Sequence, residues 1–182
     1  MKHTLSILAA LLLCTMQGWG NPNFQFCDTT SLGHALYYNI VDGTAHLVAP
    51  WTNGSGSVGW DEYPRPVGNL VIPDSVTYND TTYAVTAIDF AAFCFCRGIT
   101  SITFPSTLTQ IGNNAFWMCD ALYSQTIPNT VTSIGNNAFG WVPMVFYTGV
   151  ATGAPWGALY VNGYIEDSVY YTSSSKDTLV TL

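Results

Sequence analysis

The chain has 182 residues, of which 8% are charged and 14% are aromatic, and its formal net charge is −7. Its four Lys and Arg residues are scattered among eleven Asp and Glu, whereas nucleic acid and anionic membranes bind clustered cations. The composition therefore argues against both as partners. It favours a surface rich in hydroxyl and amide groups, on a domain long enough to bury its own core.

The first twenty residues predict a secretory signal peptide, residues 1–20. Lys2 precedes an apolar run at residues 5–13, which is about half of the ~20 residues needed to span a bilayer. We therefore expect cleavage after Gly20, a secreted or cell-surface location, and no insertion into the membrane. Acylation of Cys14 is less favoured, because a lipoprotein site has a small residue directly before the cysteine, where this chain has Leu13.

The segment that follows, residues 21–68, predicts a hairpin-rich cap. Residues 37–41 and 45–48 alternate around Asp42-Gly43, which is a strong signal for a two-residue hairpin. A Gly- and Ser-rich loop lies between Trp51 and Trp60. Since a stack of repeats needs its open edge covered, we expect this hairpin to cover the first repeat unit.

From Val85 onward the sequence repeats every 23 residues. The units are residues 85–107, 108–130 and 131–150, and IGNNAF occurs in the last two of them. Apolar residues recur in register in six columns: Val85/Leu108/Val131, Ile88/Ile111/Ile134, Ala92/Ala115/Ala138, Phe93/Phe116/Phe139, Ile99/Leu122/Val145 and Phe104/Ile127/Val150. One unit cannot bury its apolar face alone, so stacked units are expected to turn each column into a ridge of the core.

The same division predicts the local structure of each unit. Residues 99–104 and 122–127 are short strands that end at a proline, and VTAI, LTQI and VTSI form a second row of strands. Gly-Asn-Asn is a turn with unusual backbone angles, and Ala-Phe enters the core through a short helical turn. Upstream, residues 69–76 are the tail of an earlier unit, with a hairpin inserted at TYNDTTY.

Four cysteines follow the signal peptide, namely Cys27, Cys94, Cys96 and Cys119. An even number in an exported chain permits two disulfides, in three possible connectivities. A zinc site is disfavoured, because C-F-C lacks the usual gap between paired ligands and no His lies nearby. We therefore expect neither a metal nor another cofactor.

The sequence offers no catalytic group of recognisable spacing. His34 and His46 both lie in the N-terminal segment, and no strand-turn-helix nucleophile elbow is present. The adjacent carboxylates Asp61-Glu62 and Glu166-Asp167 point to different faces, whereas catalytic pairs converge across a cleft. We expect a protein that is not an enzyme.

Several of these features together resemble a known family. Ile-Gly before Ala-Phe, a Cys three residues later and a strand closing in Ile-Pro resemble the BspA-type leucine-rich repeat, over residues 69–150. The resemblance implies a mainly β fold with short helical turns: a right-handed solenoid of coils of about 23 residues, flanked by β-hairpin caps. Val142, Ala151 and Gln125 depart from the pattern, so the array decays toward its C-terminal side.

The resemblance extends to the flanks and to the cysteines. Residues 151–182, with a hairpin signal at Asn162-Gly163, are expected to form the second cap or the start of a degenerate repeat. Cys96 and Cys119 share a column in neighbouring units, and stacked strands lie ~4.8 Å apart, within reach of a disulfide. In similar repeats this Cys is a small buried side chain, which favours a ladder of thiols instead.

The residues between core positions of the predicted strands point outward and suggest a binding face. They form the rows Thr100/Tyr123/Phe146, Ser101/Ser124/Tyr147 and Thr103/Thr126/Gly149. Aromatics among hydroxyls are typical of recognition surfaces, although Phe146 and Tyr147 could equally pack under the C-terminal hairpin. Trp117 and Trp141, beside the Cys column, are further candidates for ligand binding.

The resemblance implies a non-enzymatic binding function. Similar proteins occur in Bacteroidetes, spirochaetes and some parasitic protists, and act in adhesion to host matrix proteins and in contacts between cells. An extracellular protein is therefore the expected partner. The alternatives are a carbohydrate-binding module that uses Trp51, Trp60 and Asp61-Glu62, and a structural spacer or fragment of a longer array.

Overall fold

A computed structural model describes residues 21–52, 58–60, 63–142, 144–147, 169–171 and 179–181 of the chain. These residues are mainly β and contain no helix. The strands are β1 (Asn21–Pro22), β2 (Phe26–Thr29), β3 (Ala35–Val41), β4 (Thr44–Val48), β5 (Trp51–Thr52), β6 (Val58–Gly59), β7 (Gly68–Val71), β8 (Ser75–Tyr78), β9 (Thr81–Ile88), β10 (Ile99–Thr103), β11 (Gln110–Ile111), β12 (Ser124–Ile127), β13 (Ser133–Ile134), β14 (Met144–Tyr147), β15 (Val169–Tyr171) and β16 (Leu179–Thr181).

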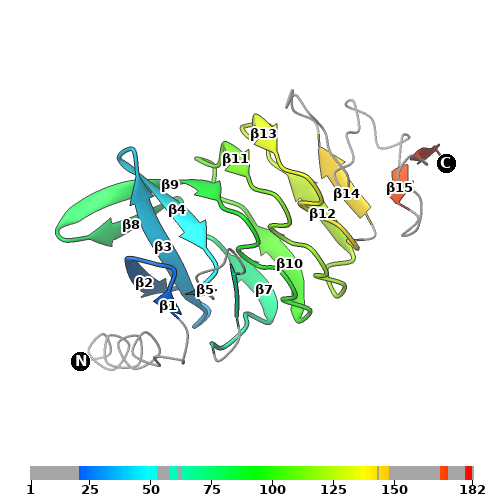
Figure 1. Cartoon of the computed structure of the whole chain (residues 1–182). Coiled ribbons are helices and arrows are strands. Elements are labelled where there is room, and N and C mark those ends of the chain that lie inside the picture. Colours follow the sequence, from blue (N-terminus) through cyan, green and yellow to red (C-terminus); the bar gives the residue numbers. More distant parts are fainter. Residues whose placement is uncertain are drawn as a thin grey trace.

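The largest sheet runs through the molecule in the order β13-β11-β9-β4-β3-β2 (Figure 1). Strands β4, β9, β11 and β13 are parallel, whereas β2, β3 and β4 are antiparallel. Gln110 lies opposite Ala87 on one side and Ser133 on the other, so its neighbours are each one 23-residue period away along the chain. The second row of strands is therefore confirmed, and β4 extends it upstream of the first unit.

The other strands of the repeats form two parallel pairs, β7 with β10 and β12 with β14. The register of β14 differs from the prediction. Phe146 lies opposite Thr126 and Tyr147 opposite Ile127, so neither shares a row with Tyr123 or Ser124 as the 23-residue spacing predicted. The third unit is effectively three residues shorter here, because the buried Val145 pairs with Gln125, which is also buried.

Both hairpins predicted upstream of the units are confirmed. Asp42 and Gly43, with φ of 48° and 78°, connect β3 to β4. Asn79 and Asp80, with φ of 48° and 59°, connect β8 to β9 within TYNDTTY. Two consecutive residues with positive φ are what a tight two-residue hairpin requires.

The residues of the predicted apolar columns form the core, although Val145 lies opposite Gln125 and not Leu122. The column members from Val85 to Val145 are buried, and Phe104 is partly buried against them, while Val150 lies outside the described residues. The Phe93, Phe116 and Phe139 rings stack with centroids 5.2 Å apart and interplanar angles of 10° and 13°. Trp60 continues this stack, 5.8 Å from Phe93 and at 20°. The repetition of the column is therefore a repetition of one ring-on-ring contact.

The Ala-Phe segments were predicted as short helical turns, and this is wrong. Residues 90–95 and their equivalents are successive turns, in which every second N–H bonds three residues back, as Ala92 does to Asp89. The intervening N–H groups bond to the next unit, as Phe93 does to Ala115 over 2.7 Å. A helix would use every N–H within its own segment, so the turns release donors that join one unit to the next.

The two halves of the Gly-Asn-Asn turn have different structural roles. Asn114 and Asn137 adopt positive φ, 56° and 53°, which Asn tolerates better than most residues. Gly112 and Gly135 do not have positive φ. A Cβ on Gly135 would lie 2.3 Å from the backbone nitrogen of Asn113, so this glycine allows the units to stack closely.

The remaining predictions concern the two ends. β15 and β16 pair antiparallel near the C-terminus, whereas residues 1–20 and Asn162-Gly163 lie outside the described residues. The part of the chain that the structure describes holds no apolar helix of membrane-spanning length.

Candidate binding surface

Among the residues whose side chains the structure describes, four aromatic side chains are exposed, and the other aromatics are buried or partly buried. The exposed fractions are 48% for Phe90, 42% for Phe95, 66% for Tyr123 and 52% for Trp141. Isolated exposed apolar residues are ordinary, but a group of large ones on one face often marks an interaction site. Phe90, Phe95 and Trp141 all belong to the turn segments of the units, and Tyr123 directly precedes β12.

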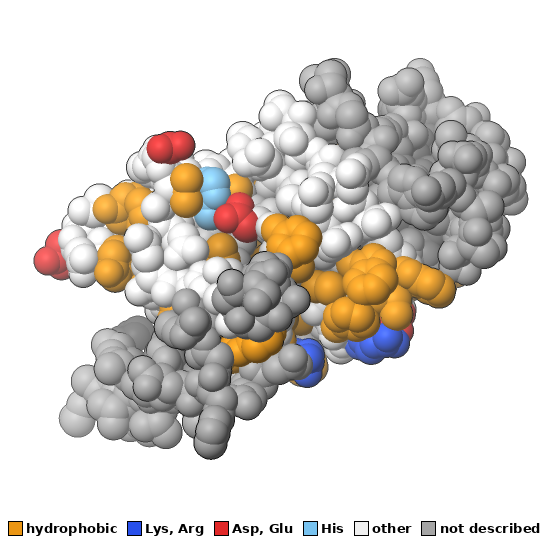
Figure 2. Space-filling model, viewed as in Figure 1, with side chains coloured by type: hydrophobic (Ala, Val, Ile, Leu, Met, Phe, Trp, Pro, Cys, Tyr) orange, Lys and Arg blue, Asp and Glu red, His pale blue; other side chains and the backbone are white. Residues whose placement is uncertain are grey.

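The turn segments bring Phe95, Trp117 and Trp141 together. Phe95 meets Trp117 edge to face, with centroids 4.9 Å apart and planes at 78°. Trp117 in turn lies against Gly140, which directly precedes Trp141. A Cβ added to Gly140 would lie 2.6 Å from the Trp117 indole. We call Phe90, Phe95, Trp117 and Trp141 the aromatic surface. Figure 2 shows hydrophobic side chains in a band across this face of the molecule, with cationic side chains along the lower edge of the band.

An ion pair borders the aromatic surface. The guanidinium carbon of Arg97 lies 5.8 Å from the centre of the Phe95 ring, within the range of a cation–π contact. Arg97 Nη1 is 2.6 Å from Asp120 Oδ2 in the next unit, and both side chains are about half exposed, 52% and 46%. The surface therefore combines flat apolar rings with one exposed donor and one exposed acceptor.

The backbone beneath the surface is unusual. Phe95, Met118 and Trp141 occupy one column and have φ of 61°, 61° and 70°. Glycine or asparagine adopts this left-handed conformation readily, whereas a bulky residue there is strained. The chain thus holds large side chains at three positions where the backbone favours small ones.

The predicted ligand-binding residues are only partly brought together. Trp117 and Trp141 join the aromatic surface, whereas Tyr123 lies beside the strands and not in the turn column. Phe146 and Tyr147 are in β14, but the described structure does not include their side chains. Phe90 and Phe95 were missed, although the column Phe95/Met118/Trp141 was visible in the sequence as a third row of large residues.

The residues of the carbohydrate alternative are not gathered into a site. Trp60 is 1% exposed, and its indole nitrogen donates to the carbonyl oxygen of Ala92 over 2.7 Å. Its assignment as a sugar-stacking residue is therefore wrong, because both its face and its N–H are used within the core. Trp51 is half-buried against the core, and Asp61-Glu62 lies outside the described residues.

Three of these four cysteines are thiols, whereas Cys27 is disulfide-bonded. Cys94, Cys96 and Cys119 are all free, so the four cysteines do not pair into two disulfides. Cys119 Sγ donates to the carbonyl oxygen of Phe93 over 3.1 Å. Burial raises the pKa of Cys119 to about 12 and that of Cys94 to about 11, and it also raises the pKa of Cys96. Protonated thiols are poor nucleophiles and poor metal ligands.

The histidines make structural contacts. His46 Nδ1 lies 3.1 Å from Asp89 Oδ1, and burial raises the pKa of Asp89 while His46 opposes that shift. His34 Nε2 lies 2.9 Å from the carbonyl oxygen of Val67. Within the described ranges, no hydrogen bond joins His46 to a hydroxyl or thiol, and no three His, Cys, Asp or Glu side chains converge as metal ligands would.

Comparison with known proteins classifies the repeats. Residues 69–144 match the family model of the BspA type leucine rich repeat region, in six copies. Residues 69–144 are a BspA-type leucine-rich repeat region. This region carries the whole aromatic surface, together with the buried columns on which it rests.

Two bacterial proteins of known structure are similar to this chain. A leucine-rich repeat protein from Bacteroides ovatus ATCC 8483 is 26% identical, with a TM-score of 0.43, over 69% of this chain and 35% of its own. A leucine rich cell surface protein from Faecalibacterium prausnitzii A2-165 is 26% identical, with a TM-score of 0.46, over 69% of this chain and 30% of its own. The chain thus spans about a third of the length of either protein. No curated protein matches it.

Proposed function

We propose that this chain is a secreted or cell-surface protein that binds other extracellular proteins and has no enzymatic activity. The observation that carries the proposal is the aromatic surface, where Phe95, Trp117 and Trp141 lie exposed or half-exposed on neighbouring BspA-type units. Aromatic residues and Arg are the side chains most enriched at the energetic centres of protein interfaces. Arg97 and Asp120 add polar partners at the edge of this surface.

The architecture in this proposal is a right-handed solenoid of coils of about 23 residues, with hairpin caps at residues 21–68 and 151–182. Its support is the parallel register of β9, β11 and β13, whose paired residues are one period apart. An array of rigid units suits a binding protein, because it holds side chains from successive units at fixed spacing on one face.

The strained backbone also supports a binding function. Phe95 and Trp141 keep large side chains at left-handed φ, where Asn would fit with less strain. Strained residues persist where the surrounding structure fixes them, and they are common at binding sites. In this proposal the strain is tolerated because these side chains contact the partner.

The test is a binding screen of residues 21–182 against a panel of immobilised matrix proteins. Its variants are Phe95→Asn and Trp141→Asn, because Asn accepts the positive φ and should leave the fold intact. Truncating a central aromatic residue of an interface typically costs at least about 2 kcal/mol, so we expect an affinity loss of roughly thirtyfold. Circular dichroism confirms that each variant is folded.

Tyr123→Ala is the matched control, since Tyr123 is equally aromatic and more exposed but lies outside the aromatic surface. Its affinity should equal that of the unchanged chain. If Tyr123→Ala alone loses binding, the strand face is the site and the aromatic surface is not. If no matrix protein binds, the adhesion proposal fails, and the repeats are better explained as a spacer or as part of a longer array.

A further inference from the structure

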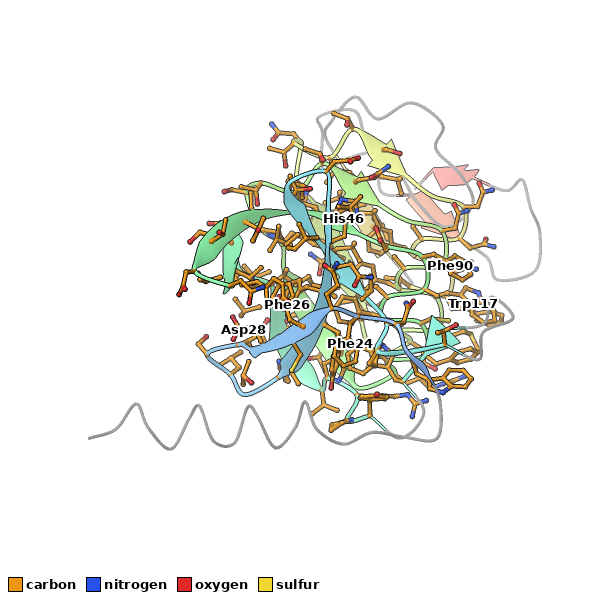
Figure 3. All side chains as sticks on the ribbon, turned by 60° about the vertical axis from the view of Figure 1, so that its left-hand side comes forward. Phe24, Phe26, Asp28, His46, Phe90 and Trp117 are labelled. Carbon is orange, nitrogen blue, oxygen red and sulfur yellow. The ribbon has the colours of Figure 1, made fainter. Side chains whose placement is uncertain are left out.

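A small pocket lies on a different part of the molecule from the aromatic surface. It is formed by the end of β2, the turn that follows it, and the segment that joins β7 to β8, and its volume is about 210 Å³. Figure 3 shows Asp28, which lines this pocket, on the opposite side of the molecule from Phe90 and Trp117. A ligand here would not compete with one on the aromatic surface.

Both walls of the pocket are held by hydrogen bonds. On one wall, Thr30 N donates to His34 O and Gly33 N donates to Thr30 O, each over 2.9 Å. On the other wall, Asp74 Oδ1 accepts from the backbone nitrogen of Ser106 over 2.6 Å and from its hydroxyl over 3.0 Å. The pocket is therefore preformed, and a ligand would not have to order it.

One buried hydroxyl that lines the pocket lacks a partner. Thr29 Oγ1 is buried and makes no hydrogen bond. Tyr38 also lines the pocket. It is 1% exposed, and its ring stacks on Phe26 at 5.4 Å. Buried polar groups in folded proteins are nearly always paired, so the Thr29 hydroxyl calls for an external partner.

The lining selects the chemistry of that partner. Asp28 is the one charged residue among the eight that line the pocket, and five others carry hydroxyls. The carboxylate disfavours anions and accepts hydrogen bonds, while the Tyr38 phenol holds its proton at neutral pH and donates. The ligand therefore needs hydrogen-bond donors and acceptors close together. A polyol has both on each hydroxyl, whereas an ammonium ion has donors but no acceptor.

The size of the pocket restricts the ligand further. A volume of about 210 Å³ equals the liquid volume of roughly seven water molecules, which is less than drug-sized ligands occupy. We propose that this pocket binds a small neutral polyhydroxylated molecule, of the size of one sugar ring. The contacts are hydrogen bonds to Asp28, Thr29 and Tyr38. The ligand does not stack on the Tyr38 ring, because Phe26 covers a face of that ring.

The test uses saturation-transfer NMR and titration of residues 21–182 with methyl glycosides of glucose, mannose and galactose, and with methylammonium chloride. We expect at least one glycoside to bind with a millimolar dissociation constant. Tyr38→Phe should weaken this binding about fivefold, which is the typical effect of one hydrogen bond. Asp28→Asn, at an exposed position, should also weaken it.

Tyr37→Phe is the matched control. The Tyr37 hydroxyl is buried and unpaired among the described residues, but Tyr37 does not line the pocket, so its loss should leave glycoside binding unchanged. Binding that falls equally in both tyrosine variants would show that the phenol has no direct role, and would overturn the proposal. So would the absence of glycoside binding at tens of millimolar, or binding of methylammonium alone.

Discussion

The indole nitrogen of Trp60 donates a hydrogen bond to the carbonyl oxygen of Ala92 over 2.7 Å. In the next unit the matching carbonyl, that of Ala115, accepts from the backbone N–H of Phe93 over the same distance. The Trp60 ring also stacks on Phe93, as the rings of successive units stack on each other. One side chain thus supplies the ring and the donor that a preceding repeat unit would supply.

Replacing Trp60 by Phe should therefore destabilise the whole domain. The substitution keeps a ring in the stack but leaves the buried Ala92 carbonyl without its donor, which costs roughly 1–3 kcal/mol. Urea denaturation followed by circular dichroism measures this change in the free energy of unfolding. Trp141→Phe is the control and should stay within about 0.5 kcal/mol, because Trp141 is exposed. Equal effects of the two substitutions would contradict the assigned role of Trp60.

Much of the repeat could be predicted because its columns are redundant. Three copies of Phe93 at one spacing identify a core position more securely than any single residue does, and all three are fully buried. The hairpin at Asp42-Gly43 was equally clear, because few dipeptides accept two positive φ angles. The turns were misread as helical, because the pattern of residues does not reveal that alternate N–H groups bond to the next unit.

The candidate site was harder to predict because its residues do not repeat. Phe90 is followed by Asn113 and Asn136 in its column, so periodicity gave it no weight. The row that joined Tyr123 to Phe146 relied on an unbroken 23-residue spacing, which β14 does not keep. Trp60 lies outside the period altogether, and only the fold places its ring on the Phe column.

The glycines of IGNNAF should tolerate substitution less well than its asparagines. A Cβ on Gly135 would overlap the backbone of Asn113, 2.3 Å away, so Gly135→Ala must separate two units and should cost about 3 kcal/mol or more. Asn137→Ala only places Ala at a φ of 53°, which costs roughly 1–2 kcal/mol. Thermal and urea unfolding of both variants checks this order, and a greater loss for Asn137→Ala would reverse the explanation.

Gln125 was expected to be a defect in an apolar column, but it joins β10 to β12. Its amide accepts from the backbone nitrogen of Ile102 and donates to the carbonyl oxygen of the same residue, each over 3.1 Å. Gln125→Leu should therefore destabilise the protein by about 2–4 kcal/mol, since two buried backbone groups lose their partners. The control Gln110→Leu, at an exposed position, should change the free energy of unfolding by less than about 0.5 kcal/mol. A stabilised Gln125→Leu variant would mean that the strands pair directly without the amide.

Stability should also depend on pH in the alkaline range. Burial raises the pKa of Cys119 from 9.0 to about 12 and that of Tyr37 from 10.0 to about 12. Between the two values of each group the unfolded chain has lost its proton while the folded chain has kept it. The unfolded state then binds fewer protons, so the free energy of unfolding falls as pH rises.

Urea denaturation of residues 21–182 should therefore give a constant midpoint at pH 7–8 and a declining one above about pH 9, where thiols of the unfolded chain begin to ionise. Each group adds at most about 1.4 kcal/mol per pH unit to the slope. Cys119→Ala lowers the stability at every pH but should also make the decline shallower, because one titrating group is gone. This is expected because Cys119 is fully buried. If the variant's free energy of unfolding declined with pH as steeply as that of the unchanged chain, or if its midpoint rose with pH, the Cys119 thiol would titrate alike in the folded and unfolded chains.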